Sequence, residues 1–276
     1  MHTHVDKLDR TKNIAKFIRK SVVKMTSLGS SSHVGSCLSI VDIVAVLYGC
    51  ILNIFPNNPK SNSRDFFILS KGHAGAAIYS ALSYVGFFDK SLLKSHCQDG
   101  SNLSGHVSHK GIPGVEFSTG SLGHGLPVAA GVALSFKIDN KDNKAYVLMS
   151  DGEFDEGSNW EAILFAAHHK LDNLVVIVDR NELQSIKSTE DTLSLEPFMD
   201  KLHSFGWNAI EVDGHNHVEL IGACQNRKKS KPTVVIAKTT KGKGVSFMEN
   251  NILWHYRSPQ GKELKDALAD LEKGDA

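Results

Sequence analysis

Two oxygen-bearing side chains, Asp151 and Asn181, come shortly after two successive apolar runs of the sequence. "AYVLMS" (145–150) directly precedes Asp151, and "NLVVIVD" (173–179) ends two residues before Asn181. If these runs are parallel strands of one β-α-β unit, their carboxyl ends meet at one edge of a sheet and both side chains face one point. A carboxylate and an amide oxygen suit a hard divalent cation such as Mg²⁺. The spacing therefore predicts a metal site.

The turns that follow these two residues could complete that site. The carbonyl of Leu183 could be a third ligand, which leaves positions for two diphosphate oxygens and a water. Gly152 has no Cβ, so a phosphate can approach its backbone, and the helix expected after it offers free N–H groups. The alternative is a plain Asp-Gly turn with a helix cap, which is the commoner role of such a pair. The Asn181 partner favours the metal site.

Histidines are the second group that could carry chemistry, and the chain has 14 of them. On residue type alone, most are expected on the surface or in the core with no catalytic role. We expect this of His168, His169, His203 and His217. The pair His106 and His109 in "HVSH" has no cysteine or carboxylate partner at ligand spacing, so we do not expect a zinc site there.

Five apolar runs must position these residues if the fold is a parallel sheet. They carry valine and isoleucine without alternation, as strands covered on both faces do, and helical patterns lie between them. We therefore expect an α/β fold, a parallel sheet with helices on both faces. Its functional loops should follow the strands, as "SKGHAG", "SDGEFDEG" and "DRNELQS" do. The five runs are 66–70, 145–150, 173–179, 207–212 and 233–239.

Two helices are expected before this sheet. Apolar residues recur at helical spacing over 9–28, with Gly29 in the place of a C-cap. The segment 39–54 is apolar almost all round, which predicts a largely buried helix with Ser39 as its N-cap.

Composition limits the partners and the compartment. Lys and Arg total 31 against 30 Asp and Glu, so we expect neither nucleic acid nor an anionic membrane as a partner. The four cysteines stand far apart without a C-x-x-C pair, which fits a reducing compartment. The N-terminal segment 1–20 is charged throughout and lacks the apolar core of a signal peptide. No apolar run reaches the roughly 20 residues that span a bilayer. We expect a cytoplasmic protein.

Several motifs, in this order, resemble the thiamine-diphosphate enzymes, and more narrowly the N-terminal part of a transketolase. They are "SSSHVGSCLSIVDIVAVLY", "NPKSNSRDFFILSKGHAG", "NLSGHVSHKGIPGVEFSTGSLGHGLPVAAG", "SDGEFDEGSNWEA" and "DRNELQS". The resemblance covers nearly the whole chain. It implies one thiamine-diphosphate-binding domain of the diphosphate-binding (PP) type over 1–276, with thiamine diphosphate and Mg²⁺, or Ca²⁺ or Mn²⁺ in its place, as cofactors.

The resemblance also assigns roles to individual residues. It implies Asp151, Asn181 and the Leu183 carbonyl as metal ligands. The cofactor contacts it implies are His33, His73, Gly120, Ser121, Leu122, Asp151, Gly152, Glu153, Asn181 and His255. The catalytic residues it implies are His33, His73, His106, His255 and Glu156, with His106 bonded to the donor's hydroxyl. Neutral imidazoles can donate to substrate oxygens and move protons near neutral pH.

Glutamates that match Glu156 and Glu161 lie at the subunit interface in transketolases, near the partner glutamate that activates the aminopyrimidine. The alternative for each is a solvated acidic helix start, where the helix dipole tolerates negative charge. The chain also departs from the family motifs. Ser150 replaces the first glycine of Gly-Asp-Gly, and Ser121 and His124 replace a proline and a glutamine, which leaves the substrate range open.

The pyrimidine-binding and C-terminal domains of a full transketolase have no counterpart in this sequence. A site shared between domain types would then need a second polypeptide, so we expect an α2β2 heterotetramer with a separately encoded C-terminal subunit. The expected function is transfer of a two-carbon ketol unit from a ketose, in particular a ketose phosphate, to an aldose, with this transferase subunit inactive alone. The alternatives are a non-catalytic cofactor-binding module and a subunit of another thiamine-diphosphate carboligase or decarboxylase. A magnesium-dependent phosphohydrolase is disfavoured, because no motif offers a phosphate-attacking aspartate.

Overall fold

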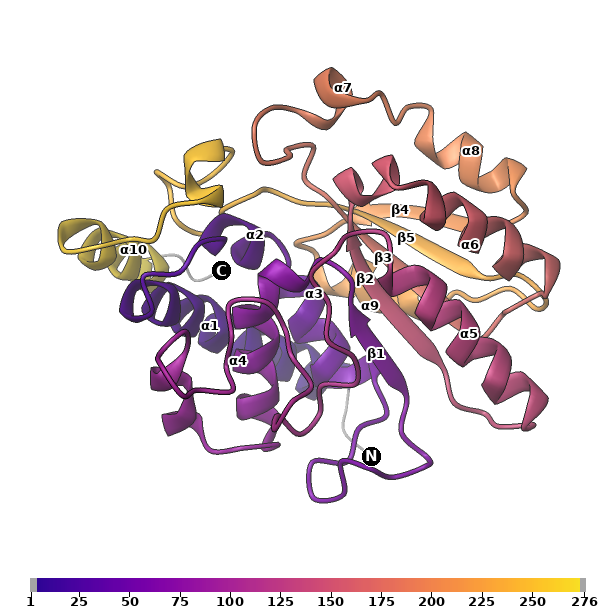
Figure 1. Cartoon of the computed structure of the whole chain (residues 1–276), viewed down its shortest axis with the longest axis horizontal. Coiled ribbons are helices and arrows are strands. Elements are labelled where there is room, and N and C mark those ends of the chain that lie inside the picture. Colours follow the sequence, from indigo (N-terminus) through magenta and orange to yellow (C-terminus); the bar gives the residue numbers. More distant parts are fainter. Residues whose placement is uncertain (1–3, 274–276) are drawn as a thin grey trace.

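A five-stranded parallel sheet forms the centre of the computed structural model, which describes residues 4–273 (Figure 1). The strand order is β1-β2-β3-β5-β4, and each neighbouring pair is parallel. All five predicted strands are confirmed to within one residue at each end. The strands are β1 (Phe66–Leu69), β2 (Ala145–Ser150), β3 (Leu174–Arg180), β4 (Asn208–Asp213) and β5 (Thr233–Lys238).

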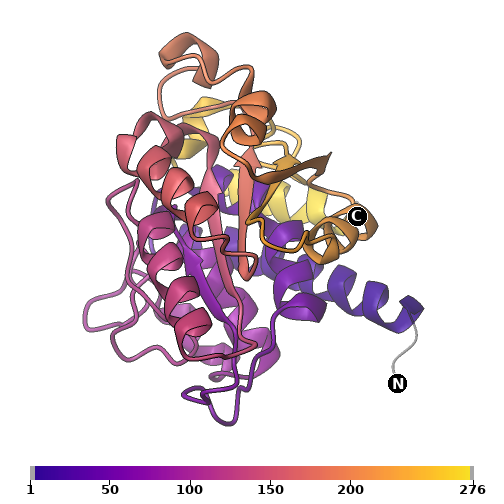
Figure 2. The same ribbon diagram turned by 90° about the vertical axis from the view of Figure 1, so that its right-hand side faces the viewer.

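Helices cover both faces of the sheet, as the sequence predicts. The first four helices and α9 pack on one face, and α5, α6 and α8 pack on the other (Figures 1 and 2). The helices are α1 (His4–Leu28), α2 (Val34–Ser39), α3 (Val41–Val46), α4 (Gly75–Val85), α5 (Gly125–Ile138), α6 (Gly157–His168), α7 (Thr189–Thr192), α8 (Phe198–Ser204), α9 (His217–Gln225) and α10 (Lys262–Lys273).

The strands are continuously apolar because each one supplies two cores. On β3, Val175 and Ile177 belong to the core beneath α1 and α4, whereas Val176 and Val178 belong to the core beneath α5 and α6. Successive side chains of a strand point to opposite faces, so a strand covered on both faces is apolar at successive positions. On β3 this holds over residues 174–178, and the buried polar pair Asp179 and Arg180 ends the strand.

The predicted helix over 39–54 is wrong in its start and its continuity. The helical segment begins at Val34, after His33 in a left-handed conformation (φ 76°), and Ser39 is the last residue of α2. The chain then bends at Ile40 before α3 and widens into a π-helix (Leu47–Ile51). The apolar run gave no sign of these breaks, because all of these segments are buried and apolar alike.

The first helix has the predicted end but starts earlier, at His4. Gly29 is not its left-handed cap, since Ser30 takes that conformation (φ 45°). A Cβ at Gly29 would lie 2.5 Å from the carbonyl oxygen of His96, so close approach explains this glycine. Among the helices of residues 4–273, none has the length and apolar character needed to cross a membrane.

Candidate active site

Ten of the predicted site residues line one cavity of about 230 Å³ at the carboxyl ends of the strands. β2 and β3 are neighbours in the sheet, with Ser150 opposite Asp179, so the residues after them emerge side by side. Parallel sheets bind ligands at this edge. The predicted residues that line the cavity are His33, His73, His106, Gly120, Leu122, Asp151, Gly152, Asn181, Leu183 and His255.

Asp151 begins a 3₁₀ turn (Asp151–Asp155) directly after β2, and its side chain is buried. Its Oδ1 accepts from the backbone N–H of Gly152 (2.8 Å). Its Oδ2 accepts from the N–H of Glu182 (2.7 Å), in the loop after β3, and lies 3.3 Å from an Arg180 nitrogen. Burial and then the nearby charge of Asp179 raise the pKa of Asp151 to about 6. A bound cation would favour the ionised form.

Asn181 and Leu183 follow β3 and turn toward the same cavity. The amide of Asn181 donates from Nδ2 to Asp179 (2.8 Å), and its Oδ1 accepts from the N–H of Leu183 (3.1 Å). The Leu183 carbonyl accepts from the ammonium of Lys241 (3.0 Å). One carboxylate, one amide oxygen and one carbonyl form an oxygen donor set, which fits Mg²⁺, Mn²⁺ or Ca²⁺. Lys241 adds a positive charge beside that set, where a diphosphate would sit.

Four imidazoles line the same cavity. The ring of His33 lies 5.0 Å from those of His73 and His255 and 5.6 Å from that of His106, measured between centroids. Burial lowers the pKa of His33 to about 4 and that of His255 to about 3, helped by the charge of Lys241. Burial and the charge of Lys71 also hold the pKa of His73 well below its usual value.

These rings come from distant parts of the chain and are tied together through the backbone. The N–H of His33 donates to the carbonyl of His255 (2.8 Å), which joins the loop before α2 to the 3₁₀ turn Ile252–His255. The carbonyl of Gly72, beside His73, accepts from the N–H of Val107 (2.9 Å). Within residues 4–273 no three His, Cys, Asp or Glu side chains form a metal-binding group. The lowered pKa values of His33, His73 and His255 make these three rings neutral donors and acceptors near pH 7.

Three predicted site residues lie outside the cavity lining. Glu153 is fully buried and accepts from the Ser70 hydroxyl (2.6 Å) and from the N–H of Ser150 (2.9 Å), so its carboxylate holds the turn after β2 in place. Ser121 is exposed, and Glu156 is exposed just before α6. Asp155, Glu161 and His124 are exposed as well. A cofactor contact by Glu153 or Ser121, and a catalytic role for Glu156, stay predictions.

The four histidines expected to have no catalytic role all lie away from the cavity lining. Three of them are exposed: His168, His169 and His203. His217 is buried, and its Nε2 lies 3.0 Å from Asp42.

Sequence reasoning missed two lysines of the cavity, Lys71 and Lys241. Both are almost fully buried. Lys71 follows β1 and Lys241 follows β5, so the rule that places function after the carboxyl ends of strands could have found them. The other lining residues that were not predicted are Ser36, Ser150, Gln184, Ser185 and Tyr256.

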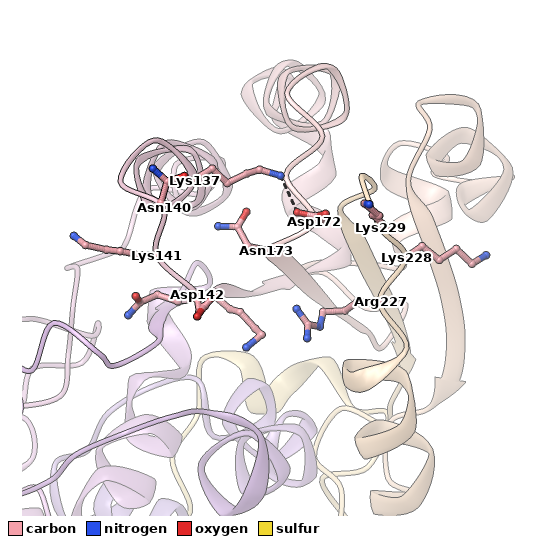
Figure 3. Close-up of a pocket in the computed structure, with 11 residues that line it drawn as sticks. Lys137, Asn140, Lys141, Asp142, Asp172, Asn173, Arg227, Lys228 and Lys229 are labelled. Atoms are coloured by element: carbon pink, nitrogen blue, oxygen red, sulfur yellow. Dashed lines mark hydrogen bonds and ion pairs between the residues drawn. The ribbon is translucent and has the colours of Figure 1, made fainter.

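A larger hollow of about 580 Å³ lies elsewhere and contains none of the predicted site residues (Figure 3). Its lining includes Lys144 and Asn173, which directly precede β2 and β3, so it lies at the amino ends of the strands. Lys137, one of its basic residues, is paired with Asp172 (2.8 Å). The chemistry therefore belongs to the smaller cavity, at the opposite edge of the sheet.

Comparisons with known proteins agree with this geometry. Residues 10–268 match the family model described as "Transketolase, thiamine diphosphate binding domain". The chain is 39% identical over 257 residues to one subunit of the apulose-4-phosphate transketolase of Phocaeicola vulgatus, covering 92% of this chain and 91% of that protein. It is 38% identical over 261 residues to 6-deoxy-6-sulfo-D-fructose transketolase subunit SqwG of Clostridium sp. (strain MSTE9), covering 94% and 95%. The crystal structure of Campylobacter jejuni transketolase matches with a TM-score of 0.87 at 32% identity, covering 98% of this chain and 43% of that chain.

Proposed function

The chain belongs to the transketolase family, and from that premise we propose that it is the cofactor-binding subunit of a two-chain transketolase. The observation that carries the proposal is the meeting of the oxygen donors of Asp151, Asn181 and Leu183 with four imidazoles around one cavity. The reaction is transfer of a two-carbon ketol unit from a ketose phosphate to an aldose. Sugars of this kind carry the hydroxyls and phosphates that neutral imidazoles and lysines bind.

The residues after β2 and β3 would hold a divalent cation, preferentially Mg²⁺, and with it the diphosphate of thiamine diphosphate. The N–H-rich turn at Gly152 and the ammonium of Lys241 would neutralise the remaining diphosphate charge. Burial, and then the charge of Lys71, lowers the pKa of Lys241 to about 8, so the ammonium form still predominates at neutral pH. Thiamine diphosphate, when bound, supplies the electron sink for the carbanion left by carbon–carbon cleavage.

The chain's own residues would orient the sugar and manage its protons. His33, His73, His106 and His255 are close enough to share a hydroxylated substrate, and depressed pKa values keep His33, His73 and His255 neutral at pH 7. A neutral imidazole donates from one nitrogen and accepts at the other. The cluster can therefore hold the donor's hydroxyls and take up or return a proton without an added charge.

A second chain would complete this site. The match covers more than nine tenths of the subunit relatives but only 43% of the transketolase chain from Campylobacter jejuni. The Phocaeicola protein is named as one subunit of its transketolase, which likewise supports a partner. We propose that a separately encoded subunit carries the pyrimidine-binding and C-terminal domains, that the two form an α2β2 heterotetramer, and that the assembly works in the cytoplasm. The four cysteines are free thiols, which fits a reducing compartment.

Reconstitution with the C-terminal subunit tests this proposal. We expect two-carbon transfer from ketose phosphates, followed by mass spectrometry of the products, only when both chains, thiamine diphosphate and Mg²⁺ are present. Asp151→Ala should abolish metal-dependent cofactor binding in calorimetric titration. The matched control is Asp200→Ala, which removes an exposed carboxylate that does not line the cavity and should bind normally. A normal rate from this chain alone, or cofactor binding unchanged in Asp151→Ala, would overturn the proposal.

A further inference from the structure

The buried carboxylate of Asp179 is bonded to Asn181, one of the proposed cation ligands, but it does not line the cavity. It lies near the end of β3 and is 0% exposed. Its Oδ2 accepts from the Ser39 hydroxyl (2.7 Å), the Lys71 ammonium (2.5 Å) and the Asn181 amide (2.8 Å). Its Oδ1 accepts from the hydroxyl of Thr239. Four donors from four segments thus converge on one side chain.

The bond from Asn181 is the one with a consequence for the cation. The two ends of an asparagine amide have nearly the same shape, but only the oxygen can bind a cation. An ionised carboxylate accepts hydrogen bonds and donates none, so Asp179 can face only the NH₂ end of Asn181. The Oδ1 end is thereby turned away from Asp179, toward the N–H of Leu183 and the cavity wall.

The other three donors satisfy the Asp179 carboxylate while it is buried. Lys71, which is 1% exposed, pairs with it directly. A buried ion pair of good geometry with extra hydrogen bonds is stable once formed, whereas removal of one partner is costly. Ser39 and Thr239 hold the carboxylate from α2 and from the end of β5.

We propose that Asp179 is a positioning residue of the cation site, which fixes the amide of Asn181 with its oxygen toward the cation. Asp179 acts through Asn181 and does not itself touch the cation or the cofactor. The inference rests on the proposed function and deepens it, because it names the residue that makes an asparagine a dependable cation ligand. Outer-shell partners of this kind orient metal ligands in many sites.

Mn²⁺ binding, measured by electron paramagnetic resonance, tests this role without any turnover. The sample is the chain, saturated with thiamine diphosphate, in complex with its C-terminal subunit. Asp179→Ala removes the acceptor of the Asn181 amide and should weaken Mn²⁺ binding by about 10- to 100-fold, the usual effect of losing an outer-shell partner. The matched control is Asp42→Ala, because Asp42 is another buried carboxylate that pairs with an arginine, Arg19, and does not line the cavity. This control should leave the Mn²⁺ affinity close to that of the wild type.

A double variant that moves the carboxylate from residue 179 to residue 181 keeps the net charge. It distinguishes an effect on the orientation of residue 181 from an effect on folding. In the double variant Asp179→Ala with Asn181→Asp, residue 181 has two oxygens, so either end can bind the cation, and one carboxylate remains in the site. We expect this variant to recover most of the Mn²⁺ affinity that Asp179→Ala loses. Wild-type affinity in Asp179→Ala, or no recovery in the double variant, would overturn the positioning role alone. Failure of the wild-type complex to bind Mn²⁺ would overturn the proposed function with it.

Discussion

At the scale of single residues, the site combines fixed positive charge with uncharged rings. The ammonium groups of Lys71 and Lys241 line the same cavity as the histidines, and their charges help to depress the pKa values of His33 and His255. The charges of these two lysines therefore have two effects. They attract an anion such as a diphosphate, and they keep the rings of His33 and His255 deprotonated. His106 stands at the edge of this cluster, exposed, where a substrate would arrive.

His106→Ala should slow the turnover of donors that carry a hydroxyl next to the carbonyl, with a smaller change in cofactor binding. A hydrogen bond that stabilises the transition state contributes about 1.5 kcal/mol, so the expected loss in kcat is about tenfold. Steady-state kinetics of the assembled enzyme measure it. His109→Ala is the control, because His109 bonds to Ser118 (2.6 Å) and does not line the cavity. Equal losses in the two variants would refute a specific role for His106.

At the scale of elements, the loops after parallel strands are held by close backbone contacts. The loop after β1 touches the segment that carries Gly120, because a Cβ on Gly72 would lie 2.4 Å from the carbonyl oxygen of Thr119. The same loop accepts the N–H of Val107, next to His106. Glycine at 72 thus brings two site segments against one another.

Gly72→Ala should push these segments apart and destabilise the chain by about 1–3 kcal/mol, the usual cost of overpacking. Gly131→Ala is the matched control, since Gly131 lies inside α5 and its added Cβ would meet no atom within 4 Å. That change should stabilise the chain by about 0.5–1 kcal/mol, because alanine has the higher helix propensity. Urea unfolding of both variants gives the two signs, and a stabilised Gly72→Ala would contradict the contact.

Strands and their loops could be predicted from the sequence because a strand buried on both faces carries a continuous apolar run, as β2 does over 145–149 and β3 over 174–178. The convergence of Asp151 and Asn181 followed from that periodicity. The breaks between α2, α3 and the π-helix could not, since their residues are all buried and apolar. The lysines at 71 and 241 were missed because lysine is ordinarily a surface residue, and only the fold shows what they face.

At the scale of the whole molecule, one buried histidine makes the stability of the fold depend on pH. His96 is buried, and its Nδ1 has no hydrogen-bond partner, which is true of no other ring nitrogen buried within residues 4–273. Burial lowers the pKa of His96 to about 4. The folded chain therefore keeps His96 neutral, whereas the unfolded chain protonates it below about pH 6.5.

The stability contributed by this neutral ring is complete above pH 6.5 and is lost as the pH falls toward 4. Between pH 7.5 and pH 5, the loss from His96 should be about 2 kcal/mol in the free energy of unfolding. His96→Gln, which cannot take up the proton, should show a correspondingly smaller decline between those pH values in urea unfolding. Identical pH dependence in the two proteins would contradict the assignment of this effect to His96.

The backbone bond between His33 and His255 also bears on how the protein is made. A chain leaving the ribosome exposes His33 early, but its partner carbonyl is made more than two hundred residues later. Synthesis must therefore pass residue 255 before this bond can form and join the two segments of the cavity wall.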